Sequence, residues 1–118
     1  MKKIFSGFRE NITYPDSSNF RVFIQKNHYH IDPHWHPCVE IILPLSGDYQ
    51  VVIEGETFHL EKGDIMFLHS GTIHALSGPP KGARLIFQFD VEILYSLREF
   101  QSLLFSFLKF PLLYSKTG

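Results

Sequence analysis

The sequence predicts a mainly β fold that is followed by a helical segment. Residues 1–90 contain short stretches rich in β-branched and aromatic residues, and Gly-containing turns separate them at regular spacing. Residues 91–108 contain neither Gly nor Pro, and Leu, Phe and Ile recur there three and four positions apart. We therefore expect an antiparallel sandwich or small barrel over residues 1–90 and a helical segment within residues 91–118.

The composition limits the classes of function. The chain has 118 residues, of which 44% are hydrophobic and 15% aromatic, which is enough for one domain with a real core. The formal net charge of −1 gives no basic field that would attract nucleic acid or anionic lipid. The single cysteine, Cys38, excludes an internal disulfide. The sequence shows no signal peptide and no run of about 18 apolar residues, so we expect a cytoplasmic protein without a membrane anchor.

Seven strands are expected in the β region, and each is bounded by turn residues. The turns fall at residues 46–48, 54–56, 61–64 and 77–82, where Gly, Asp, Glu, Ser and Pro gather. The strands between and around them cover residues 19–25, 39–43, 49–53, 57–60, 65–68, 74–76 and 83–89.

The helix is expected to begin after Asp90, a suitable N-cap with Glu92 in the first turn, and to end before Pro111. Its apolar residues cover more than one face, so it requires burial on two sides. One side can be the barrel, and the other a second chain or a missing domain; the alternative is a helix fully buried in its own domain. We assign four residues to a homodimer interface: Leu97, Phe100, Leu104 and Phe107.

The most unusual stretch is H-W-H-P-C-V-E, residues 34–40. Alternate residues of a strand point to the same face, so His34 and His36 can direct two imidazoles into one space, and Glu40 shares their parity. A third imidazole from a distant strand would complete a set of three nitrogens and one oxygen, which suits Zn, Ni, Fe or Mn. The candidates for this third ligand are His59, His69 and His74.

Other interpretations of this stretch stay open. Exposed strand histidines are common, and we interpret the similar pair His28 and His30 as surface or hydrogen-bonded core residues. Cys38 has the same parity as His34 and is a possible substitute ligand. The two prolines that flank the histidines interrupt a regular strand and weaken the parity argument.

Two motifs carry a resemblance to cupins. Residues 34–47 read H-x-H-x3-E-x6-G, which resembles the first cupin motif, and residues 63–74 read G-D-I-M-F-L-H-S-G-x2-H, which resembles the second. The resemblance implies a cupin (double-stranded β-helix, or jelly-roll) barrel. It also implies that His34, His36, Glu40 and His74 are the ligands of a divalent metal.

The chain further resembles the N-terminal, effector-sensing domain of AraC-type transcription regulators. This resemblance rests on residues 40–47, 58–68, 73–76 and 84–90 and on the apolar segment after them. It implies a barrel at 1–90 that binds a small molecule, often a sugar or related metabolite, and a helical dimerisation and linker segment at 91–118. The family's C-terminal helix-turn-helix pair, which binds DNA, is not in this sequence, so we expect a longer protein.

Three positions depart from the cupin motifs: His28, His69 and Gly78 stand where Gly, Pro and Asn are usual. These departures change the surroundings of the metal relative to cupin enzymes and weaken the case for catalysis. His69 is expected near the barrel mouth as an effector contact. Three apolar residues are expected against the carbon face of the effector: Phe23, Met66 and Phe87.

Three functions follow from these expectations. The first is a non-catalytic sensor, in which the metal has a structural role or anchors the effector. The second is a stand-alone, metal-dependent cupin enzyme, such as an oxygenase, isomerase or lyase. The third is a metal-free binding or storage barrel, in which the four polar side chains bond a ligand directly.

Overall fold

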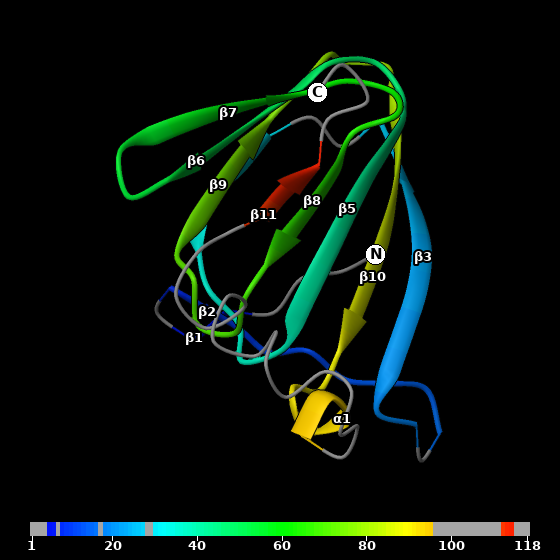
Figure 1. Cartoon of the computed structure of the whole chain (residues 1–118), viewed down its shortest axis with the longest axis vertical. Coiled ribbons are helices and arrows are strands. Elements are labelled where there is room, and N and C mark those ends of the chain that lie inside the picture. Colours follow the sequence, from blue (N-terminus) through cyan, green and yellow to red (C-terminus); the bar gives the residue numbers. More distant parts are fainter. Residues whose placement is uncertain (1–4, 7, 17, 28–29, 96–111, 115–118) are drawn as a thin grey trace.

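A computed structural model describes residues 5–6, 8–16, 18–27, 30–95 and 112–114. Strands dominate this part of the chain, and the one helix within it is short (Figure 1). The elements are β1 (Phe5–Ser6), β2 (Arg9–Glu10), β3 (Phe20–Lys26), β4 (His30–His34), β5 (Val39–Ser46), β6 (Tyr49–Ile53), β7 (Glu56–Leu60), β8 (Ile65–Leu68), β9 (His74–Ser77), β10 (Ala83–Phe89), α1 (Glu92–Tyr95) and β11 (Leu112–Tyr114).

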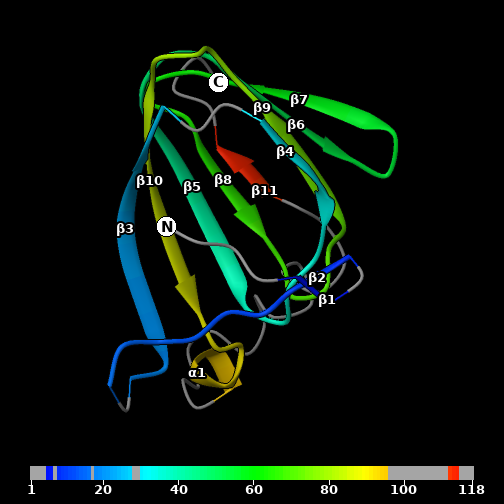
Figure 2. The ribbon, with the colours of Figure 1, turned by 180° about the vertical axis from the view of Figure 1, so that it is seen from behind.

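Two antiparallel sheets form the body of the molecule. One has five strands in the order β11-β8-β5-β10-β3, and the other has four in the order β4-β9-β6-β7. The sheets face each other in both views, and the small β1–β2 pair lies at the same end as α1 (Figures 1 and 2). The predicted mainly β architecture is therefore confirmed, although β4 and the two N-terminal strands were not expected.

The core lies between the two sheets and follows the two-residue period of the strands. In β6, for example, Tyr49, Val51 and Ile53 are buried, whereas Gln50 and Val52 are exposed. Apolar side chains from both sheets meet there in one cluster, formed by Ile31, Ile42, Tyr49, Val51, Ile53, Leu60, Met66, Leu68 and Leu76.

A second, smaller cluster covers one end of the outer face of the five-stranded sheet. Val39 and Phe89 are buried there, and Val91 and Ile93 pack against them from the start of α1. The predicted helix thus begins at Glu92, but its remainder, including Leu97, Phe100, Leu104 and Phe107, lies outside the described residues. Within the expected helical segment, β11 pairs with β8 and extends the barrel sheet, which the sequence pattern did not indicate.

The opposite edge of this sheet is formed by β3, whose outward side chains are apolar. Phe20, Val22 and Ile24 are 46%, 47% and 52% exposed. Phe20 stacks on Phe87 of the neighbouring β10 with ring centroids 5.9 Å apart. Among the described residues, no helix has the length and apolar character needed to cross a membrane.

Candidate metal centre

Three buried histidines and one glutamate converge between the two sheets. His34 at the end of β4 and His74 at the start of β9 are register partners. His36 lies in the connection from β4 to β5, and Glu40 lies on β5. One ring nitrogen from each histidine lies within 4.8 Å of the others, and the three side chains are 1–3% exposed. The structure therefore brings together the four residues that the motifs single out.

The three rings share one hydrogen-bonding scheme. Nδ1 of His34 lies 2.9 Å from the carbonyl oxygen of Asp32, and Nδ1 of His74 lies 2.8 Å from that of Thr72. Nδ1 of His36 lies 3.2 Å from the carbonyl oxygen of Cys38. Because a carbonyl oxygen can only accept, each Nδ1 carries the proton and donates it. In the neutral ring the lone pair is then on Nε2, as a metal ligand requires.

Glu40 faces two of these Nε2 atoms and is held from behind. Its Oε1 lies 3.2 Å from His36 Nε2, and its Oε2 lies 3.8 Å from His74 Nε2. The buried amide of Gln88 on β10 donates to Glu40 Oε1 at 2.5 Å. Arg21 on β3 donates in turn to Gln88 Oε1 at 2.6 Å. This Arg21–Gln88–Glu40 chain orients the carboxylate toward the histidines.

Burial and close pairing set the charge state of the centre. Burial lowers the pKa of His74 to about 4, and it also lowers the pKa of His34, so both rings are neutral at pH 7. Burial disfavours the charged forms of His36 and Glu40 as well, but it is outweighed: hydrogen bonds to Cys38 and Glu40 favour charged His36, and the pairing with His36 favours ionised Glu40. The pKa of Glu40 is therefore held well below its usual range, and that of His36 is raised to about 11.

The residues present fit a divalent cation. Nε2 of His36 and Nε2 of His74 are buried, and within the described part of the chain neither makes a hydrogen bond of good geometry. Both face the carboxylate of Glu40, whose Oε1 also accepts a hydrogen bond from Gln88. Buried polar atoms without such a bond are costly, and a metal ion would satisfy them. Three imidazole nitrogens and a carboxylate oxygen suit Zn, Ni, Fe or Mn.

A second carboxylate, which the sequence did not indicate, lies beside the centre. Glu10 on β2 is 2% exposed, and its Oε1 lies 3.5 Å from Nε2 of His34. Residues 8–10, here called the N-terminal arm, bring it there: Glu10 N donates to Trp35 O at 2.8 Å, and Trp35 N donates to Phe8 O at 2.9 Å. A lone Glu far upstream of both motifs has no spacing that could reveal this contact.

The remaining polar residues of the motif region lie around the four. Cys38 is buried, and its Sγ lies 3.2 Å from Nδ1 of His36, on the ring nitrogen that does not face Glu40. It therefore supports His36 from behind and does not join the ligand set. His30 is exposed and bonds Asp32 at 2.9 Å, as expected for a surface residue, whereas His28 lies outside the described residues.

The residues expected to contact an effector do not share one face. Met66 is fully buried in the core, and Phe23 is half-buried on β3 beneath the guanidinium of Arg21. Phe87 has the opposite parity to Gln88, which bonds Glu40, so Phe87 lies on the outer face of the sheet. It is thus directed away from the interior that holds Met66.

His69 and His59 lie apart from the centre. His69 is half-buried after β8, where its Nδ1 lies 3.0 Å from the Ser70 carbonyl oxygen and 2.9 Å from Thr72 Oγ1. His59 is exposed on β7. The third imidazole of the buried cluster is therefore His74, and neither of the other two candidates belongs to it.

Comparison with known proteins places this architecture in a known group. The family described as the AraC-like ligand binding domain matches residues 19–96. No relative was found among curated proteins.

Several solved structures have the same fold. Apo ToxT from Vibrio cholerae, as a point variant, superposes with a TM-score of 0.63 at 13% identity over 85% of this chain. Wild-type ToxT with a bound unsaturated fatty acid gives 0.61, also at 13% identity, over 87%. A variant of oxalate decarboxylase OxdC from Bacillus subtilis gives 0.51 at 25% identity over 63%. The chain spans 43% of either ToxT chain and 22% of the decarboxylase.

Proposed function

Because the chain belongs to the family of AraC-like ligand-binding domains, we propose that it is the small-molecule sensing domain of a transcription regulator and that its barrel holds a divalent metal. The observation that carries the proposal is the buried set of His34, His36, His74 and Glu40 inside a barrel of this family. A sugar or related metabolite remains the effector class that the family resemblance implies.

Each residue of the centre has a distinct role in this proposal. The three imidazoles would supply Nε2 ligands, and their Nδ1 hydrogen bonds hold them in place. A metal would displace the Nε2 proton that the raised pKa of His36 otherwise retains at pH 7. Glu40 supplies an anionic oxygen, and Gln88 fixes its orientation. A bound divalent metal would act as a Lewis acid toward an oxygen of the effector. Glu10, beside His34, links the N-terminal arm to the occupancy of the centre.

The proposal extends to the rest of the regulator. The apolar segment that follows α1 in the sequence would form a homodimer contact through Leu97, Phe100, Leu104 and Phe107, and a helix-turn-helix pair beyond Gly118 would bind DNA. Reading the gene past the codon for Gly118 tests this directly. We expect the frame to continue for about a hundred residues, the order of a small domain, with two helix-turn-helix patterns. A frame without such patterns would overturn the regulator assignment.

Metal content tests the centre itself. We expect protein dialysed against a weak chelator, which strips metal from exposed sites, to keep close to one equivalent of a divalent ion by elemental mass spectrometry. His74→Ala should lose most of this ion, because the variant removes one of three buried nitrogen ligands. His30→Ala is the matched control, since His30 is exposed and outside the cluster. Equal metal loss in both variants would contradict the assignment.

A stand-alone cupin enzyme is the second candidate, and the likeness to oxalate decarboxylase favours it. A three-histidine, one-carboxylate set leaves coordination positions open for a substrate or for O₂. The two candidates differ in a turnover assay on the metal-loaded protein with small carboxylic acids, oxalate included. Sustained turnover would favour the enzyme, whereas a ligand that stabilises the protein without being consumed would favour the sensor.

A further inference from the structure

A second group of side chains of the types that bind metals lies on the outer face of the four-stranded sheet. Tyr49 and Leu60 are register partners in the β6–β7 hairpin and point into the core, so the residues on either side of them point outward. Asp48, His59 and Glu61 thus share the outer face at the base of the hairpin. Their donor atoms lie within 4.8 Å of one another, and all three side chains are exposed.

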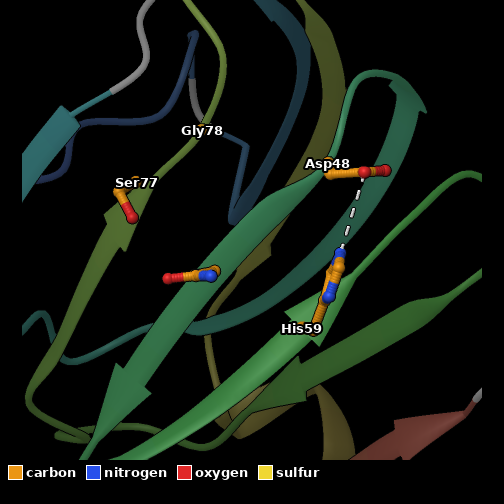
Figure 3. Close-up of a pocket in the computed structure, with 5 residues that line it drawn as sticks. Asp48, His59, Ser77 and Gly78 are labelled. Atoms are coloured by element: carbon orange, nitrogen blue, oxygen red, sulfur yellow. Dashed lines mark ion pairs between the residues drawn. The ribbon is translucent and has the colours of Figure 1, made fainter.

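A cavity of about 340 Å³ adjoins this group. Asp48 and His59 line it together with Gln50 of β6, Ser77 of β9 and the neighbouring Gly78. Nε2 of His59 lies 3.9 Å from Oδ2 of Asp48, and the two side chains point toward each other on one side of the cavity (Figure 3). Gln50 and Ser77 add side-chain oxygens to the lining, which are further donors for a cation or its bound water.

We propose that Asp48, His59 and Glu61 bind a second divalent cation of the first transition row, on the opposite side of the sheet from the buried centre. One imidazole and two carboxylates form a mixed nitrogen and oxygen set, which favours Zn²⁺ and its neighbours over Mg²⁺ or Ca²⁺. Three protein ligands leave positions open toward the cavity. The site is therefore a surface at which a metal could hold water or an oxygen ligand.

Charge supports a cation here. Asp48 and Glu61 lie one position beyond the Tyr49–Leu60 pair, so two carboxylates meet across the base of one hairpin. Like charges opposite each other in a sheet are destabilising. A divalent ion bound by both carboxylates would join the two strand ends. The distance of 3.9 Å between His59 and Asp48 leaves room for an ion, because a metal near 2.1 Å from each donor spans about 3–4 Å between them.

The test is a Zn²⁺ titration, followed by calorimetry, of full-length protein that has been stripped of metal with a chelator. His74→Ala, which disables the buried centre, should still bind one equivalent of Zn²⁺. Adding His59→Ala to that variant should weaken this binding by about tenfold or more, since losing a ligand costs at least as much as losing its supporting hydrogen bond. His59 is exposed, and circular dichroism checks that the variants fold.

His30→Ala in the same background is the matched control, because His30 is also exposed and lies 2.9 Å from a single carboxylate of Asp32. Unchanged affinity in this control is expected. The proposal fails if His74→Ala binds no Zn²⁺, or if His59→Ala and His30→Ala weaken binding equally. Because the assay starts from a disabled buried centre, failure of the buried centre in wild-type protein would leave this result unaffected, and the two proposals are tested separately.

Discussion

At the scale of single residues, the neutral side chain of Gln88 determines how the Glu40 carboxylate is oriented. Its side chain is 1% exposed, donates to Glu40 and accepts from Arg21. An amide in this place can fix the carboxylate without adding charge to a centre that already holds Glu40 and Glu10. The structural consequence is a carboxylate whose orientation does not depend on solvent.

Gln88→Met should therefore weaken metal binding without removing a ligand. The substitution keeps the volume of the buried side chain but loses both hydrogen bonds, and loss of such support lowers metal affinity by about 10- to 100-fold. The measurement is a competition titration against a chromogenic chelator. Thr57→Val, exposed on β7 and outside both proposed sites, is the control that should leave metal affinity unchanged. Equal affinity in Gln88→Met and wild type would show that Glu40 needs no such support.

At the scale of elements, the loop between β9 and β10 closes one end of the core around Tyr49. A Cβ added at Gly78 would overlap the Tyr49 ring, and one added at Gly82 would lie 2.6 Å from its hydroxyl oxygen. The guanidinium of the buried Arg84 lies 5.4 Å from the centre of the same ring. Glycine at these two positions thus allows a large aromatic side chain and a cation to share the end of the barrel.

Gly78→Ala should consequently lower the free energy of unfolding by about 1–3 kcal/mol, the range for overpacking. In a Tyr49→Leu background the same change should cost much less, because the ring that is overlapped is gone. Denaturant unfolding of wild type, the two single variants and the double variant gives the coupling free energy between the two positions. A full cost in the Tyr49→Leu background would mean that the loop backbone, and not the ring, requires glycine.

Some elements and some residues of the buried centre could be predicted from the sequence, whereas others depend on tertiary pairing. The strands with strict alternation, such as β6, were predictable because one face is buried and the other is wet. The four residues of the centre were predictable because two spaced motifs carry them. Glu10 was not, since its place depends on a pairing between the N-terminal arm and Trp35 that leaves no local pattern. The outward direction of Phe87 needed the observed register, because β10 reverses the usual pattern: Arg84 and Gln88 lie on its inner face, and Phe87 lies on an apolar outer face.

At the scale of the whole molecule, we predict that the exposed edge at β3 promotes association in solution. This strand is seven residues long and contains no proline, and its outer face presents Phe20, Val22 and Ile24. No described strand pairs with its far side. Long apolar edges of this kind pair with other edges.

Val22→Glu should reduce concentration-dependent association, because it places a charge in the middle of the apolar edge. Light scattering across a dilution series measures the effect. Val52→Glu is the matched control: it makes the same change on β6, a strand paired on both sides in the other sheet, where Val52 is 38% exposed. An equal reduction by both substitutions would show that added charge, and not the edge, is responsible.

The hydrogen-bond chain from Arg21 to Glu40 gives this edge a further meaning. Arg21 belongs to β3, so the strand that is open to partners also supports, through Gln88, a carboxylate of the buried centre. Any partner that shifts β3 changes the environment of Glu40, and any occupant that pulls on Glu40 changes the strand. Binding free energies at two linked sites are reciprocal. Pairing of a partner with β3 and metal binding at the buried centre would then be thermodynamically coupled, so that each changes the affinity of the other.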